Sequence, residues 1–223
     1  MIMKKSRLRT IIIFFFLSVL YPVLFSCNRS EPKISFGFIS LTYYQERNKF
    51  VERYSFFVLP EDEDGLENLE DLYLYHDRDQ LRWHLKSSDW VKFSKGGKDW
   101  IGTRSISIQE GESLPRGRFR AVLVNKGGEK TEKIFSFDVP EEARLPFPTL
   151  EISNGRYAVN SAYPNNYLIF YNDRGEILNS VKLNVLENNL SALTYQSNSR
   201  SASLWAEDPE HFTSVLTNDA PLH

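Results

Sequence analysis

The chain is poor in cysteine, since Cys27 is the only one among 223 residues. A single thiol excludes an internal disulfide, and it also excludes the thiolate clusters of structural zinc sites. Histidine is scarce too, and its four positions show neither an HExxH motif nor any other paired spacing: His76, His84, His211 and His223. We therefore expect no metal and no cofactor.

Basic charge is also limited. The sequence holds 27 Lys and Arg against 29 Asp and Glu. Nucleic-acid binding needs Lys and Arg clustered against phosphates, and no such cluster is present. We expect no nucleic-acid partner.

Motifs for catalysis are missing as well. The sequence has no G-x-S-x-G nucleophile turn, no S-x-x-K motif and no glycine-rich phosphate loop before a helix. The acidic loop 61–65 resembles a calcium loop only in part, because the EF-hand alignment puts Pro60 where the first oxygen ligand is required. We favour a solvated loop there and an ordinary turn at 76–79, and we predict that the protein is not an enzyme.

The N-terminus, by contrast, is rich in signals. Its first ten residues carry four basic side chains and no acidic one, and residues 11–25 are almost wholly apolar. This order is typical of an export signal. Ser18 and Pro22 interrupt the apolar run, which is shorter than the ~20 residues that a spanning helix needs. We expect residues 1–26 to be a signal peptide.

The residues that end this segment, Leu24, Phe25, Ser26 and Cys27, resemble the lipobox of bacterial lipoproteins. Phe25 departs from the usual small or aliphatic residue, a laxity similar to that of spirochaete lipoproteins. The resemblance implies that Cys27 is acylated with diacylglycerol (palmitate) and becomes the mature N-terminus. It also implies a polar tether at 27–33 and a protein anchored to a bacterial membrane in the cell envelope, on the periplasmic face or the cell surface.

The remaining body alternates apolar and polar residues in short runs that end at Gly, Pro, Asn or Asp. Such runs predict β-strands. We predict an all-β protein with two small β-sandwich domains, at 34–139 and 149–223, joined by a Pro-rich linker at 140–148. The clearest hairpins are 114–139, with a turn at Lys126-Gly127-Gly128, and 167–185, with a turn at 172–175.

The first of these hairpins opens with Pro115, Gly117 and Phe119. This arrangement resembles the corresponding part of immunoglobulin-like and fibronectin type III-like sandwiches. In those domains the aromatic residue is usually a tyrosine whose hydroxyl binds the backbone, and Phe119 lacks that hydroxyl.

Aromatic residues are more numerous than a sandwich core requires. Packing across the two faces of the sheets, or under loops, would account for most of them. The alternative is an exposed surface that binds a partner, because Tyr and Trp are enriched in interfaces. The candidates are Tyr43, Tyr73, Tyr75, Trp83, Trp90 and Trp100.

These observations predict a membrane-anchored, non-enzymatic binding or scaffolding module that contacts another envelope protein or a host protein. The competing hypothesis is a carbohydrate-binding or hydrolytic lipoprotein that uses an aromatic and acidic cleft. Two carboxylates facing each other across stacked Trp rings would favour the second hypothesis. The oligomeric state and the ligand stay open.

Overall fold

A computed structural model describes residues 30–109, 112–139 and 145–222. Within these ranges every regular element is a β-strand or a three-residue 3-10 turn. The described part contains no helix with the length and hydropathy to span a bilayer. The all-β prediction is confirmed, whereas the expected signal peptide and Cys27 lie outside the described residues.

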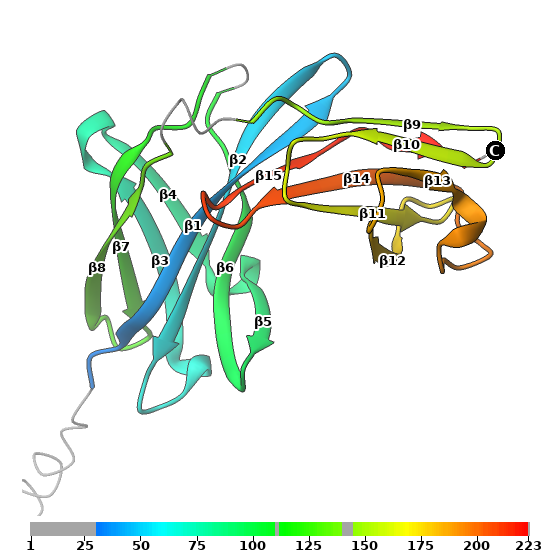
Figure 1. Cartoon of the computed structure of the whole chain (residues 1–223). Helices are drawn as coiled ribbons and strands as arrows, with labels where there is room; N and C mark the ends of the chain where they lie inside the picture. Colours follow the sequence, from blue (N-terminus) through cyan, green and yellow to red (C-terminus); the bar gives the residue numbers. More distant parts are fainter. Residues whose placement is uncertain (1–29, 110–111, 140–144, 223) are drawn as a thin grey trace, which may run out of the picture.

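Nine strands form one large sheet, sheet A, which runs through the whole body (Figure 1). One of the nine, β16 (Ala220–Pro221), pairs with β14 outside the main strand order. In spatial order the others are β12 (Ile177–Lys182), β11 (Asn165–Tyr171), β14 (Ser201–Asp208), β15 (Thr213–Leu216), β1 (Lys33–Glu46), β2 (Lys49–Glu61), β6 (Lys98–Ile106) and β5 (Val91–Lys95).

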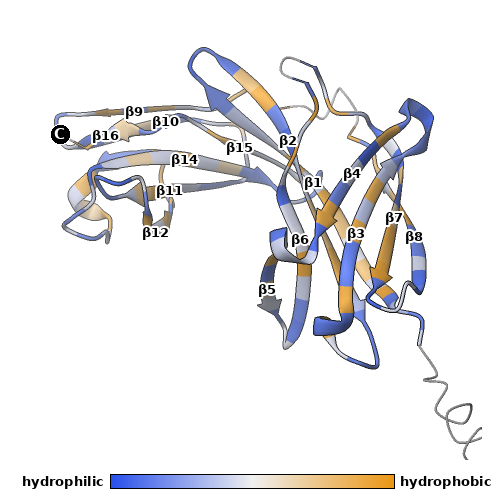
Figure 2. Ribbon diagram, turned by 180° about the vertical axis from the view of Figure 1, so that it is seen from behind, coloured by the Kyte–Doolittle hydropathy of each residue, from blue (hydrophilic) through white to orange (hydrophobic). Residues whose placement is uncertain are grey.

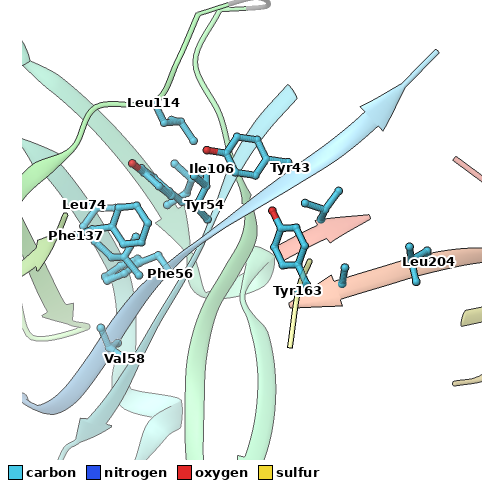
Figure 3. Close-up of a cluster of buried hydrophobic side chains, with 14 of the residues drawn as sticks. Tyr43, Tyr54, Phe56, Val58, Leu74, Ile106, Leu114, Phe137, Tyr163 and Leu204 are labelled. Carbon is cyan, nitrogen blue, oxygen red and sulfur yellow. The ribbon is translucent and has the colours of Figure 1, made fainter. Parts of the chain in front are cut away.

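A four-stranded sheet, sheet B, packs against the β1–β2–β6–β5 part of sheet A. Its order is β4 (Leu81–Lys86), β3 (Leu69–His76), β7 (Gly117–Asn125) and β8 (Lys130–Phe137). Buried residues from both sheets fill the space between them, including Tyr54, Phe56, Leu74 and Phe137 (Figure 3). This is the first sandwich.

A second sandwich follows in the chain. The three-stranded sheet β13 (Glu187–Asn189), β10 (Arg156–Asn160) and β9 (Thr149–Ser153) faces the β11–β14 part of sheet A. Tyr157, Phe170 and Leu204 are almost fully buried there. The predicted sandwich architecture is therefore confirmed.

The two sandwiches are joined by strand pairing. β1 pairs in parallel with β15, from Leu41 opposite Thr213 to Tyr44 opposite Leu216. Phe147, in the predicted linker, stacks on Phe50 of β2 with ring centroids 3.8 Å apart. Residues 140–144 of that linker lie outside the described residues, and the proposed domain boundaries stay a prediction.

Both predicted hairpins are present, and asparagine organises both turns. Between β7 and β8, the Asn125 Oδ1 accepts hydrogen bonds from the backbone N–H groups of Gly127 and Glu129. Between β11 and β12, the Asn172 Oδ1 does the same for two N–H groups of its turn. This use of an Asn side chain to mimic a backbone turn explains why short polar segments reverse the chain at these points.

Candidate functional site

Two of the six candidate aromatics lie in the core rather than on a surface. Tyr43 of β1 is only 7% exposed and lies among the buried hydrophobic side chains (Figure 3). Its ring meets Phe147 edge-on with centroids 5.1 Å apart. Trp90 is 8% exposed, and its Nε1 donates to the backbone oxygen of Leu85 at 3.0 Å. The expected exposure of these two residues is wrong, because each packs against neighbouring elements in the fold.

Two other candidates occupy intermediate positions. Trp83 of β4 shares its side of the strand with Leu81 and Leu85, and its Nε1 donates to the Ser107 oxygen at 2.8 Å. Trp100 of β6 belongs to an aromatic cluster on the outer face of sheet A, where it lies parallel to Phe93 with centroids 6.1 Å apart. Neither lies on the surface that holds the last two candidates.

Tyr73 and Tyr75 do come together, on the outer face of sheet B. Along β3 the buried residues Leu72, Leu74 and His76 alternate with these half-exposed tyrosines, as the hydropathy of the strand also shows (Figure 2). The two rings are 6.0 Å apart, with an angle of 28° between their planes. We call this surface the tyrosine face and define it by Asp71, Tyr73, Tyr75, Arg82, His84, Arg120 and Glu132.

Strand β4 supplies one side of the tyrosine face. His84 is the direct cross-strand neighbour of Tyr73, and the two rings stack with centroids 4.4 Å apart. The Nε2 of His84 donates to the Asp71 carboxylate at 2.6 Å. Arg82 places its guanidinium 6.0 Å from the centre of the Tyr73 ring. Tyr73 is thus held by a ring on one side and a cation near its face.

Strand β7 supplies the other side. Arg120 lies opposite Tyr75, and its guanidinium carbon is 4.4 Å from the ring centroid. The same guanidinium donates twice to the Asp77 carboxylate, at 2.8 and 3.0 Å, and once to Glu132 at 3.3 Å. A bidentate pair fixes the plane of a guanidinium, so Arg120 is oriented before any partner arrives.

The electrostatics of the face agree with this arrangement. The hydrogen bond from Arg120 lowers the pKa of Asp77, and the same bond raises the pKa of Arg120. Because the folded pKa of Asp77 is depressed, its contribution to stability is present above the unfolded pKa and is lost only as the pH falls through the folded value. Partial burial, followed by the charge of Asp71, raises the pKa of Tyr73 above its ordinary value.

The tyrosine face therefore combines rigid aromatic rings with oriented arginines. Neither tyrosine hydroxyl has a hydrogen-bond partner within the described part of the chain. Side chains already held in one geometry lose little conformational freedom on association. Tyr and Arg are also the residue types that dominate binding energy in protein interfaces. This arrangement is suited to recognition of a partner surface.

A groove of about 560 Å³ lies near the β1–β2 hairpin, away from the tyrosine face. Its acidic lining residues are Glu46, Glu52 and Glu112. Glu46 and Glu52 are already bound by arginine, at 3.0 Å from Arg53 and 2.8 Å from Arg116. Its aromatic residues are Tyr43, Phe50 and Phe147. This groove does not have the two opposed carboxylates across stacked Trp rings that the carbohydrate hypothesis requires.

The two acidic features also have local structural roles. Asp62 accepts hydrogen bonds from the Asp64 backbone and the Asn68 side chain, which closes its loop. Residues 77–79 form a 3-10 turn, and His76 is 1% exposed, with its Nε2 3.1 Å from the Arg116 oxygen. Among the described residues, no group of three or more His, Cys, Asp or Glu side chains could hold a metal ion.

The basic members of the tyrosine face were not predicted as site residues. The sequence does contain one signal for them: Arg82, His84 and Arg120 occupy the polar positions of strands whose apolar positions form the core. The contact of Arg120 with Tyr75, however, depends on the register between β3 and β7, which are far apart in the chain.

Comparisons with known proteins identify no relative by sequence. No family model and no curated protein matches the chain. Solved structures that share a general likeness include dimeric latent PorU from Porphyromonas gingivalis, with 14% identity, a TM-score of 0.34, and coverage of 86% of this chain but 20% of that one.

Two further solved structures have lower scores. The BSP domain of a biofilm-associated protein is 8% identical, with a TM-score of 0.27 and coverage of 86% of this chain and 29% of that one. The complex of Dpr11 IG1 with DIP-gamma IG+IG2 is 11% identical, with a TM-score of 0.26 and coverage of 85% and 98%. The chain thus spans less than a third of the length of the first two structures. Structural likenesses at these TM-scores do not indicate a function.

Proposed function

We propose that the protein is a membrane-anchored, non-enzymatic binding or scaffolding module of a bacterial cell envelope. Lipid on Cys27 holds it at the membrane, and the tyrosine face binds a protein partner. The observation that carries the proposal is the prearranged set of Tyr73, Tyr75 and Arg120 on an exposed sheet face, with ring and guanidinium geometry fixed by neighbouring side chains.

The position of the face suits such an anchor. Ser30, three residues after Cys27, accepts a hydrogen bond from the Asn125 side chain, and Asn125 pairs with Leu69 at the start of β3. Tyr75 lies six residues further along β3, which at about 3.3 Å per residue is ~20 Å from that end. A lipid on Cys27 would therefore leave the Tyr75 end of the face directed away from the bilayer.

The proposal is tested by crosslinking in the intact envelope together with metabolic palmitate labelling of the full chain. We expect wild-type protein to incorporate palmitate and to yield one dominant crosslinked protein. Replacement of the only thiol, Cys27→Ala, should remove the label and release the body from the membrane, because a diacyl anchor supplies the two chains that stable attachment generally needs.

Two results would count against the proposal. Membrane attachment of Cys27→Ala at wild-type levels would show that the lipid is not the anchor. Recovery of glycan, or of no protein, from wild-type crosslinking would contradict the binding role and favour the carbohydrate hypothesis.

A further inference from the structure

The carboxylates of the tyrosine face already have partners. Asp71 is bound by His84, and Asp77 and Glu132 are both bound by Arg120. These three carboxylates are therefore compensated within the protein. A partner would meet the charges that remain.

Beside the paired carboxylates the surface also carries basic side chains. Arg82, Lys86 and Arg118 are exposed and lie on the outward side of β4 and β7. None of the three forms an ion pair within the described residues, and the guanidinium of Arg82 lies 6.0 Å from the centre of the Tyr73 ring. The mature chain has 23 basic against 29 acidic side chains once the four basic residues of the expected signal are removed, about −6 in all. These three basic side chains thus stand out on a protein that is acidic as a whole.

A hollow of about 470 Å³ lies at the Tyr75 end of the face. Arg78, Arg118 and Arg120 line it together with Asp77, and Ile134 beside them is 43% exposed. Arg78 and Arg120 are paired with Asp79 and Asp77, which leaves Arg118 as the arginine of this lining without an ion pair among the described residues. A planar guanidinium group donates two parallel hydrogen bonds to a carboxylate, so Arg118 beside exposed apolar surface fits an acidic side chain of a partner.

We infer that the partner held by the tyrosine face presents an acidic segment, rich in Asp and Glu, to Arg82, Lys86 and Arg118, the last of these at the hollow. This inference rests on the proposed function and adds the chemistry of the partner. Complementary charge would steer the partner and fix its register, while Tyr73, Tyr75 and Ile134 supply the desolvated contacts. The hollow is at the end of β3 remote from Ser30, which favours a protein segment over a lipid headgroup.

The test measures fluorescence anisotropy of a labelled ten-residue polyglutamate peptide with the full chain in detergent micelles. We expect the peptide to bind at low salt and Arg118→Glu to weaken binding about tenfold or more, because an attractive charge becomes repulsive. Arg82→Glu should weaken it in the same direction. Raising the NaCl concentration to about 0.5 M should also weaken binding, because salt screens exposed charges.

The matched control is Arg174→Glu, which makes the same change in net charge on the exposed turn between β11 and β12. It should leave the affinity within about twofold of wild type. Failure of polyglutamate to bind, or equal losses in Arg118→Glu and Arg174→Glu, would overturn the inference. Preferential binding of a polylysine peptide would overturn it as well.

The acidic character of the partner and the scaffolding role can each be rejected without the other. If the envelope crosslink captures a protein but polyglutamate does not bind, only the acidic character of the partner is rejected. If polyglutamate binds at Arg118 but the envelope yields no protein partner, the scaffolding role is rejected while the anion-binding surface stands.

Discussion

Gly102→Ala is expected to cost about 3–5 kcal/mol of folding free energy, much of the total stability of a typical domain. Gly102 of β6 pairs with Phe57 of β2 inside sheet A. A Cβ at this position would lie 2.0 Å from the Phe56 carbonyl oxygen and 2.8 Å from the Phe57 Cα. Both are backbone atoms, so the pairing of the two strands must break or shift. Urea unfolding followed by circular dichroism measures the loss.

A matched substitution separates this clash from the general effect of adding a methyl group to a glycine. Gly97 lies in the β5–β6 turn at φ +70°, and a Cβ there meets open space. Gly97→Ala should therefore cost only about 1–2 kcal/mol, the penalty for a left-handed conformation. Equal losses for the two variants would contradict the close approach of β2 and β6.

Glu52→Gln is expected to destabilise the first sandwich by about 2–4 kcal/mol, a fall in Tm of roughly 5–12 °C. The Glu52 carboxylate binds Arg116 at 2.8 and 3.2 Å and accepts the Leu114 N–H at 2.8 Å. The Glu52 side chain is 11% exposed and that of Arg116 is 29% exposed. The amide keeps the shape of the carboxylate but leaves the guanidinium without its counter-charge.

The same cluster fastens the segment before β7 to β2. The hydroxyl of Tyr54 donates to the Pro115 oxygen and accepts from Arg116. Burial raises the pKa of Tyr54. Burial alone would lower the pKa of Arg116, but the hydrogen bonds and the charge of Glu52 outweigh this effect, and the pKa of Arg116 is raised. Arg116 therefore stays charged, and losing Glu52 leaves a cation in a half-buried site.

Glu46→Gln is the control for this variant. Glu46 also pairs with an arginine, Arg53 at 3.0 Å, but the two side chains are 42% and 39% exposed. Exposed ion pairs contribute about 0–1 kcal/mol, so the Tm of Glu46→Gln should be close to that of wild type. Equal Tm values for the Glu52→Gln and Glu46→Gln proteins would contradict the structural role of the Glu52–Arg116 pair.

The elements that were predictable from sequence are those fixed by local chemistry. Asn125 and Asn172 close their hairpins through bonds to residues two and four positions away, so the turn residues alone reveal them. Strand parity is also local. Because side chains alternate between the two faces of a strand, Trp83 lies on the same side as Leu81 and Leu85, away from the tyrosine face.

The features that were not predictable depend on pairing between distant segments. Tyr43 and Tyr44 are adjacent and point to opposite faces, and the sequence does not reveal which face becomes core. The parallel pairing of β1 with β15, which unites the two sandwiches in one sheet, joins residues more than 170 positions apart. The contact of Arg120 with Tyr75 likewise follows from the register of β3 against β7. Non-local register is not encoded in any short stretch of sequence.

The most direct test of the account is the affinity of the tyrosine face for the protein captured in the envelope. Tyr73→Ala combined with Tyr75→Ala should weaken that complex by about 2 kcal/mol or more, roughly thirtyfold in Kd, without changing the thermal unfolding transition by more than a few degrees. Ile177→Ser, which alters a residue 66% exposed on the second sandwich, should bind as wild type does. Unchanged affinity in the double tyrosine variant, in protein that folds normally, would contradict the assignment of binding to this face.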